Sequence, residues 1–315
     1  MARWRVLVSA PYLQSALDDY RGVLEDRGAE LVVPQVHERL SEAELLDLVG
    51  DIHGVIAGDD QFTEKVLLKA APALKVISKW GTGIDAFDLD ACRRLGIKVC
   101  NTPGAFTLPV ADSVLGYILA FARQLPWMDQ QMKGGTWHKI PGRSLSESVL
   151  GIIGFGNIGR AVARRARSFG MEVMANDILE IDDAVIAELG VRMVEKEELL
   201  QSSDFVSLNC DLNETSRHLT NGRTLGLMKP SAVLINTARG PLIDEPALIA
   251  ALEAGIIAGA ALDVFEHEPL PQDSPLRRMS NVMLAPHNSN SSPTAWKRVH
   301  ENTIDNLFGV LEGAA

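Results

Sequence analysis

Three polar side chains follow three apolar runs in the second half of the sequence, and their types suit acid–base chemistry beside an anion. The run "AVLIN" leads to Arg239, "GAALDVF" leads to Glu268, and "VMLA" leads to His287. An arginine fork can clamp a carboxylate, and an imidazole beside a carboxylate can exchange a proton near neutral pH. Each residue alone is commonly a surface charge or a structural histidine. If the three runs are neighbouring parallel strands, their carboxyl ends share one edge, and the three side chains form a candidate catalytic group.

A second candidate site is a glycine pattern, G-x-G-x-x-G, formed by Gly154, Gly156 and Gly159. It stands between an apolar strand-like run and an Ala/Arg-rich helical run, which is the context of dinucleotide binding. The glycines permit a tight turn, close approach of a pyrophosphate and close packing of helix on strand. Asp177 follows the next strand-like run, where a carboxylate accepts the ribose hydroxyls of NAD and repels the extra phosphate of NADP. The pattern predicts an NAD site; a glycine turn without a ligand is the alternative.

The elements that must position these residues alternate between strand and helix along the whole chain, which indicates parallel sheets covered by helices. We expect an α/β fold with two doubly wound parallel sheets. Ser41 and Glu44 form a capping box before one helix. Residues 109–125 read as a nearly all-apolar helix that either bridges two domains or packs against another subunit. Residues 294–311 read as a helix that returns to the first domain. The expected strands include 5–8, 30–33, 54–57, 74–78, 97–100, 149–153 and 171–175.

Composition sets the class of protein. The 315 residues are 46% hydrophobic and 23% charged, which is ordinary for a globular chain of two domains. The net charge of −11 disfavours a nucleic-acid or anionic-membrane partner. Cys92, Cys100 and Cys210 are widely spaced and form no metal-ligand pattern, so no metal is expected. The sequence shows no signal peptide and no apolar stretch of membrane-spanning length, and we expect a cytoplasmic protein.

Taken together, these motifs resemble the D-isomer-specific 2-hydroxyacid dehydrogenases along nearly the whole chain. The resemblance implies a Rossmann NAD-binding domain at residues 100–287. It also implies a flavodoxin-like substrate domain made of residues 1–99 and 288–315. The matching blocks are "LKVISKWGTGIDAFDLDACRRLGIKVCNTPG", "VLGIIGFGNIGRAVA", "LMKPSAVLINTARGPLIDEPALIAAL", "GAALDVFEHEPLP" and "NVMLAPHN".

The resemblance also implies roles for individual residues. Arg239, Glu268 and His287 match the family's catalytic residues: the arginine binds the substrate carboxylate and polarises its carbonyl, the histidine exchanges the proton, and the glutamate orients the histidine. Arg239 and His287 therefore also count as substrate-binding. The turn Gly81-Thr82-Gly83 is expected to present backbone amides to the substrate carboxylate. Further cofactor contacts are expected from Thr82, Gly154, Gly156, Asn157, Ile158, Gly159, Asp177, Cys210, Thr237 and Asp263, the last near the nicotinamide amide; Cys210 has packing as its alternative reading.

Two segments depart from the common family pattern. Asn288-Ser289-Asn290 stands where many relatives carry Gly or Ala, and it either lines the cleft or caps the last helix. The carboxylates of Asp59 and Asp60 stand where phosphoglycerate dehydrogenases often place a basic residue, so they are expected to repel a substrate phosphate. Glu268 also stands where formate dehydrogenases of the family carry Gln, which argues against that activity.

The sequence therefore favours a reversible NAD-dependent D-2-hydroxyacid dehydrogenase. Its expected substrate is a small 2-oxo acid of the glyoxylate or hydroxypyruvate type, with 3-phosphoglycerate and phosphohydroxypyruvate as the less favoured pair. The alternative is an NAD(H)-sensing, corepressor-like binding protein on the same fold. A homodimer is expected from the apolar helix 109–125 together with the resemblance. No nucleic-acid or membrane partner is expected.

Overall fold

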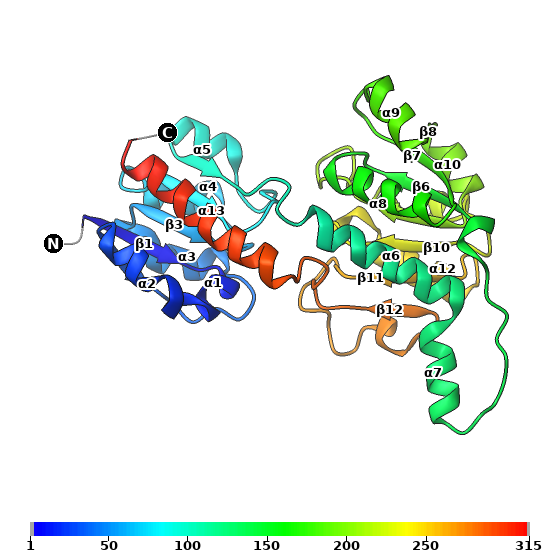
Figure 1. Cartoon of the computed structure of the whole chain (residues 1–315). Coiled ribbons are helices and arrows are strands. Elements are labelled where there is room, and N and C mark those ends of the chain that lie inside the picture. Colours follow the sequence, from blue (N-terminus) through cyan, green and yellow to red (C-terminus); the bar gives the residue numbers. More distant parts are fainter. Residues whose placement is uncertain (1–2, 314–315) are drawn as a thin grey trace. The chain divides into compact units, whose positions relative to one another are not determined.

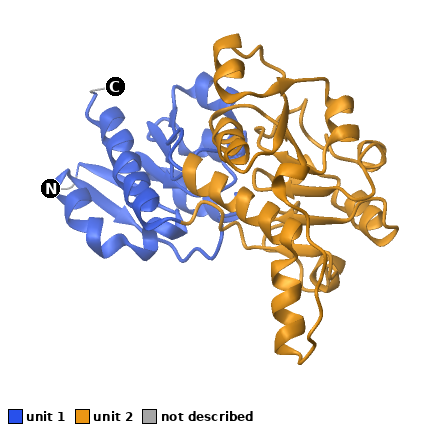
Figure 2. Cartoon of the chain, turned by 45° about the vertical axis from the view of Figure 1, so that its right-hand side comes forward, with its two compact units in different colours: residues 1–106, 292–315 blue, residues 107–291 orange. Residues whose placement is uncertain are grey.

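The computed structural model describes residues 3–313, which form two α/β units (Figures 1 and 2). Unit 1 runs to residue 106 and resumes at 292, and unit 2 is residues 107–291. The chain therefore changes units seven residues after the expected boundary at 99/100 and four after the one at 287/288. Hydrogen bonds explain both differences. Asn101 and Thr102 bond to the turn after the fourth strand of unit 1, whereas the amides of Asn288 and Ser289 bond to Asp263 in unit 2.

Unit 1 contains a five-stranded parallel sheet in the order β2-β1-β3-β4-β5, which is the flavodoxin-like order. The central strands β3 and β4 are buried along their whole length, as expected of a sheet covered on both faces. The strands are β1 (Trp4–Val8), β2 (Ala29–Val32), β3 (Gly54–Ala57), β4 (Val76–Lys79) and β5 (Lys98–Cys100).

The helices of unit 1 include one that comes from the far end of the chain. In α3 the predicted capping box is present, because Ser41 and Glu44 exchange side-chain and backbone hydrogen bonds. Helix α13 packs against β3 and β4, where a Cβ added at Gly54 would meet Leu307 at 2.7 Å. The return of the last helix to the first sheet is thereby confirmed. The helices are α1 (Pro11–Ser15), α2 (Leu17–Asp26), α3 (Glu42–Leu48), α4 (Glu64–Ala70), α5 (Leu89–Leu95) and α13 (Pro293–Leu311), with a 3₁₀ turn at Val49–Asp51.

Unit 2 contains a seven-stranded parallel sheet in the order β12-β11-β10-β9-β6-β7-β8. Counted within the unit, this is 7-6-5-4-1-2-3, the doubly wound dinucleotide-binding order with one strand added. The order reverses between β6 and β9, and that switch point is where such sheets bind ligands. The strands are β6 (Val149–Ile153), β7 (Glu172–Asn176), β8 (Arg192–Met193), β9 (Phe205–Leu208), β10 (Val233–Asn236), β11 (Gly259–Leu262) and β12 (Val282–Leu284).

The long apolar helix predicted at 109–125 is α6 (Thr107–Arg123), and it is buried inside unit 2 itself. Ala111, Val114 and Ile118 belong to one core cluster with residues of α8. Their burial therefore requires neither a bridge nor a second subunit. The remaining helices are α7 (Leu125–Lys133), α8 (Asn157–Ser168), α9 (Asp183–Leu189), α10 (Lys196–Ser202), α11 (Gly222–Leu225) and α12 (Glu245–Glu253), with 3₁₀ turns at Leu145–Glu147, Gly240–Leu242 and Pro275–Arg278. Among residues 3–313, no helix combines the length and hydropathy needed to cross a bilayer.

Candidate active site

The glycine pattern forms the turn between β6 and α8, and its three glycines have different surroundings. Gly154 has a φ of +91°, and a Cβ there would overlap the backbone amide of Cys210. A Cβ at Gly159 would overlap the carbonyl oxygen of Gly154. Gly156 instead faces open space, with no atom within 4 Å of an added Cβ. Two glycines thus close the turn, and the third leaves room at the amino end of α8, where a phosphate group fits.

Asp177 lies beside this turn, immediately after the end of β7. Its Oδ2 accepts a hydrogen bond from the amide of Phe155 at 2.6 Å, and its Oδ1 accepts one from the amide of Leu179 at 2.9 Å. The next two side chains, Ile178 and Leu179, are 76% and 70% exposed. A fixed carboxylate next to an uncovered apolar surface matches the ribose and the adenine of a dinucleotide.

Unsatisfied polar atoms lie after the neighbouring strands β9 and β10. Asn209 Oδ1 and Thr237 Oγ1 are buried without a hydrogen-bond partner among the described residues. Buried polar atoms are nearly always paired, so both indicate a place for polar groups of a ligand. Asn209 was missed in the sequence. Its neighbour Cys210 has a pKa raised to about 11 by burial, so its thiol is protonated, and its backbone packs against Gly154.

The histidine and glutamate singled out in the sequence form a bonded pair. His287 Nδ1 lies 3.0 Å from Glu268 Oε2, and the other carboxylate oxygen accepts the amide of Phe265 at 2.9 Å. His287 has a φ of +51°, and its own amide donates to the carbonyl of Asp263 at 2.7 Å. Both ends of the pair are thus fixed by backbone bonds. Since an ionised Glu268 only accepts, Nδ1 carries a proton, and exchange with a substrate falls to Nε2.

Asp263 has partners other than those expected for a nicotinamide contact. It is 1% exposed, and its two carboxylate oxygens accept the amides of Asn288 and Ser289 at 2.7 and 2.8 Å. Asp263 therefore holds the turn that follows His287. The segment Asn288-Ser289-Asn290 is the backbone that Asp263 ties down, and the cap of α13 is Ser292 instead.

Arg239 follows β10 in a turn that is closely bonded. Asn236 accepts the amide of Ala238 at 3.1 Å and donates to the carbonyl of Arg239 at 2.8 Å. The guanidinium Nη1 donates to the carbonyl of Ala238 at 2.8 Å. A Cβ at Gly240 would overlap the carbonyl of Phe265, so this turn packs directly on the loop that leads to Glu268. The structure thus places the Arg239 turn against the loop of Glu268, whose partner is His287.

In unit 1, the turn Gly81-Thr82-Gly83 follows β4, and its first two carbonyls are hydrogen-bonded whereas its amides are unpaired among the described residues. The Gly81 carbonyl accepts the amide and the hydroxyl of Thr102, both at 2.9 Å. The Thr82 carbonyl accepts Asn101 Nδ2 at 2.6 Å, and the Thr82 hydroxyl donates to the carbonyl of Thr102. No described residue accepts a hydrogen bond from the three amides of the turn. With Gly81 at a φ of +122°, the turn is an amide nest suited to an anion.

The two carboxylates after β3 have separate structural roles. Asp60 is fully buried and accepts hydrogen bonds from Ser9 Oγ and from the amides of Leu40 and Gly58, while burial raises its pKa. Asp59 pairs with Lys79 Nζ at 3.1 Å, and the Lys79 side chain is only 5% exposed. Asp60 thus holds the surrounding loops together and Asp59 is paired with Lys79, so the expected repulsion of a substrate phosphate stays a prediction.

A further ion pair was missed because its partners are far apart in the sequence. His218 Nε2 lies 2.6 Å from Glu266 Oε1, and the amide of Glu266 donates to Glu245 Oε2 at 3.2 Å. Burial and the neighbouring Glu266 raise the pKa of Glu245. These contacts brace the loop that carries Glu268, and no local signal in the sequence connects them.

The geometry is that of a dinucleotide-binding sheet with a hydrogen-bonded histidine–glutamate pair after its last strands, and known proteins are similar to this chain. Residues 115–289, more than half of the chain, match the family model described as D-isomer specific 2-hydroxyacid dehydrogenase, NAD binding domain. The chain belongs to this family. The expected family, the NAD cofactor and the oxidoreductase class are thereby confirmed.

Individual members of the family are similar over nearly the whole chain. The glyoxylate reductase of Korarchaeum cryptofilum is 38% identical over 87% of this chain and 84% of its own length. The hydroxypyruvate reductase of Thermotoga maritima is 36% identical over 99% of both chains. The structure of D-lactate dehydrogenase from Aquifex aeolicus, complexed with NAD and lactic acid, matches with a TM-score of 0.88 and 28% identity, covering 98% of this chain and 96% of that one. The fold and the NAD-dependent 2-hydroxyacid dehydrogenase class thus rest on similarity across both units.

Proposed function

We propose that this 2-hydroxyacid dehydrogenase reduces small 2-oxo acids of the glyoxylate or hydroxypyruvate type to D-hydroxy acids, with His287 as the acid–base residue. The observation that carries the proposal is the 3.0 Å contact of His287 Nδ1 with Glu268, whose other oxygen is held by the Phe265 amide. The carboxylate favours the imidazolium form and fixes the ring orientation. Nε2 then donates a proton to the oxygen of the reduced carbonyl and removes it in the reverse direction.

Arg239 is assigned to the substrate carboxylate and carbonyl oxygen. Its planar fork can bind both groups at once, and its charge opposes the negative charge that grows on the carbonyl oxygen during reduction. The amide nest at Gly81-Thr82-Gly83 is assigned to the substrate carboxylate as well, as the family resemblance implies, because its three amides have no acceptor within the described chain. Asp263 holds the turn after His287, and its assignment to the nicotinamide amide is kept as part of the proposal.

The residues present fit an NAD cofactor. Gly156 and the amino end of α8, beginning at Asn157 and Ile158, would hold the pyrophosphate, and Asp177 the ribose. Thr237 would meet a polar group of the cofactor with its unpaired hydroxyl. Cys210 contributes its backbone and its packing. Bound NADH supplies the hydride that reduces the carbonyl carbon.

The test is oxidation of NADH and NADPH with glyoxylate, hydroxypyruvate, phosphohydroxypyruvate, pyruvate and bulkier 2-oxo acids. We expect turnover with NADH, and the highest kcat/KM with glyoxylate and hydroxypyruvate. His287→Asn is the matched variant, because Asn tolerates a positive φ better than most residues. It should lower kcat by about 10²–10⁴-fold with NADH binding unchanged. NADH protection against heating without turnover on any acid would favour the binding-protein alternative, and phosphohydroxypyruvate as the best substrate would overturn the substrate class.

We further propose that the protein is a homodimer joined through α7 and the loop that follows it, residues 125–144. Helix α7 has no buried side chain, and it stands away from the rest of unit 2 (Figures 1 and 2). Leu125 and Met132 are each 51% exposed, and Trp137 is 88% exposed. Large apolar side chains exposed along one segment are typical of a protein interface. The occupant we propose is a second copy of the chain. A cytoplasmic location is also proposed, since Cys92, Cys100 and Cys210 are all unpaired.

A further inference from the structure

Trp80 connects the amide nest to the last helix of unit 1. It is the residue between β4 and Gly81, and it is 4% exposed. Its indole Nε1 donates a hydrogen bond to Nδ1 of His300, 2.9 Å away on α13. His300 is itself 5% exposed. A buried donor and a buried acceptor that satisfy each other fix both side chains, because either one left alone would be costly.

Aromatic rings surround the Trp80 indole. Tyr12 stacks on it with ring centroids 5.0 Å apart and planes at 28°, and Phe106 and Trp296 lie 5.6 and 6.0 Å away. The ring of His300 lies 5.6 Å from the indole. The ring contacts fix the plane of the Trp80 indole. Among the described contacts of its side chain, the hydrogen bond to His300 is the directional one, and it fixes the rotation of the indole within that plane.

The backbone of Trp80 is held as firmly as its ring. Its amide donates to the carbonyl of Ala57 at 2.9 Å, and its carbonyl accepts Lys79 Nζ at 3.1 Å. The next residue, Gly81, has a φ of +122° and begins the nest. The direction of the nest amides therefore depends on how Trp80 is seated.

We propose that His300 is a positioning residue for substrate binding: by holding the Trp80 indole, it fixes the direction of the Gly81-Thr82-Gly83 amides toward the substrate carboxylate. This inference rests on the proposed assignment of the nest to that carboxylate. It predicts that His300 affects KM for the 2-oxo acid rather than NADH binding, because the glycine turn, Asp177 and Thr237, to which the cofactor is assigned, belong to unit 2.

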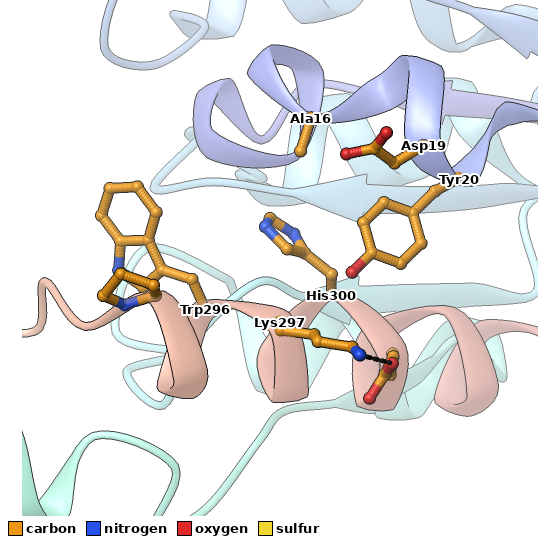
Figure 3. A pocket seen from close by; sticks show the side chains of 8 residues that line it. Ala16, Asp19, Tyr20, Trp296, Lys297 and His300 are labelled. Carbon is orange, nitrogen blue, oxygen red and sulfur yellow. Dashed lines mark ion pairs between the residues drawn. The ribbon is translucent and has the colours of Figure 1, made fainter.

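His300 also lines a pocket of about 490 Å³ (Figure 3). The His300 ring points from α13 toward α2, with Ala16, Asp19 and Tyr20 opposite. The charged and titratable groups around it are Asp19 and Tyr20 on α2 and Lys297 and Glu301 on α13. The pocket thus gives solvent protons a route to the imidazole.

Protonation of His300 would place a proton on Nδ1 and remove the acceptor for Trp80. Burial lowers the pKa of His300 below its ordinary value of 6.5, against an opposing effect of Glu301, so the ring is neutral and the bond intact at neutral pH. The bond is lost only as pH falls through this lowered pKa. KM for the 2-oxo acid should therefore rise as pH falls through the lowered pKa of His300, because protonation breaks the bond to Trp80.

Asn and Leu at position 300 give a matched pair of nearly equal shape. The Asn amide oxygen occupies the place of Nδ1 and accepts from Trp80, whereas Leu does not. We expect His300→Leu to raise KM for glyoxylate about 3- to 10-fold, the effect of one lost hydrogen bond. His300→Asn should stay near the wild-type KM at pH 7.5, with the NADH dissociation constant unchanged in both variants.

Trp80→Phe keeps the ring and removes the donor, so it tests the bond without changing His300. It should raise KM as His300→Leu does, and the double variant should be no worse than either single one. The ratio of wild-type KM to that of His300→Asn should increase as pH falls below 6.5, since Asn does not titrate.

A wild-type KM in both His300→Leu and Trp80→Phe, or additive effects in the double variant, would overturn the positioning role. If His300→Leu fails to fold, Trp80→Phe and His300→Asn carry the test alone. Absence of turnover by the wild-type enzyme on every acid would instead refute the proposed function, so the two failures are distinguishable.

Discussion

His287 is held in a backbone conformation that a non-glycine residue adopts only at a cost of about 1–2 kcal/mol. Its φ of +51° persists because its amide donates to the Asp263 carbonyl, its ring bonds to Glu268, and Asp263 binds the next two amides. Retaining a strained residue at the centre of so many bonds is typical of a functional position. The strain aims the imidazole rather than stabilising the fold.

At the same scale, Arg239→Lys tests whether guanidinium geometry or charge alone matters. Lysine keeps the positive charge but loses the planar fork and the Nη1 bond to the Ala238 carbonyl. We expect kcat/KM for glyoxylate to fall about 10- to 100-fold, mainly through KM, as for a lost charged hydrogen bond. Steady-state kinetics at saturating NADH measure this, with NADH binding as the control. A wild-type KM would mean that Arg239 does not bind the carboxylate.

Single residues show where sequence reasoning succeeds and where it stops. Arg239, Glu268 and His287 were predictable because each follows an apolar strand run, and parallel topology brings strand ends to one edge. The bonding of Asp60 and Asp263 was not predictable, because their partners are backbone amides whose direction only the folded turns define. The Trp80–His300 bond joins residues 220 positions apart, which no local pattern can reveal.

At the scale of elements, the β6–α8 turn separates structural glycines from the one that serves a ligand. Gly159→Ala forces a methyl group onto the Gly154 carbonyl, whereas Gly156→Ala places one in open space. The first should destabilise the fold by about 1–3 kcal/mol, as overpacking does. The second should leave the melting temperature unchanged but raise the NADH dissociation constant about tenfold or more, because its methyl occupies pyrophosphate space.

Thermal unfolding with and without NADH, together with fluorescence titration of NADH, measures both variants. Each variant is the control for the other, since the same methyl group is added three residues apart. Unchanged NADH binding by Gly156→Ala would mean that the pyrophosphate lies elsewhere.

Alternation of strand and helix was sufficient to predict both sheets, because apolar runs of four or five residues between helical segments are typical of strands in a parallel sheet. The short strand β8, Arg192–Met193, is the weakest case, since only two residues pair with β7. The unit boundaries depend on side-chain hydrogen bonds of Thr102 and Asp263, which the hydrophobic periodicity of a sequence does not predict.

For the whole molecule, the last helix makes unit 1 discontinuous, so this unit needs both ends of the chain. Leu307 of α13 packs on Gly54, and Arg27, the residue after α2, stacks on Phe308 and pairs with Glu312. The helix that completes the sheet also carries His300. Helix α13 therefore contributes both to the packing of unit 1 and, in our proposal, to the orientation of the amide nest.

Also at this scale, the dimer proposal predicts that α7 and the loop after it bind a second copy. Leu125→Lys combined with Trp137→Lys places two charges in the apolar surface of residues 125–144, and burying unpaired charges is strongly unfavourable. Leu68→Lys is the matched control, because Leu68 is 58% exposed on α4 of unit 1 and outside that surface. Light scattering coupled to gel filtration should give twice the chain mass for the wild type and for Leu68→Lys, and the single-chain mass for the double variant.

A stable interface of this kind buries at least about 1,000 Å², so the double variant should also show a lower melting temperature that no longer depends on protein concentration. Monomeric wild-type protein at micromolar concentration, or an unchanged dimer in the double variant, would contradict the assignment of residues 125–144 to the interface.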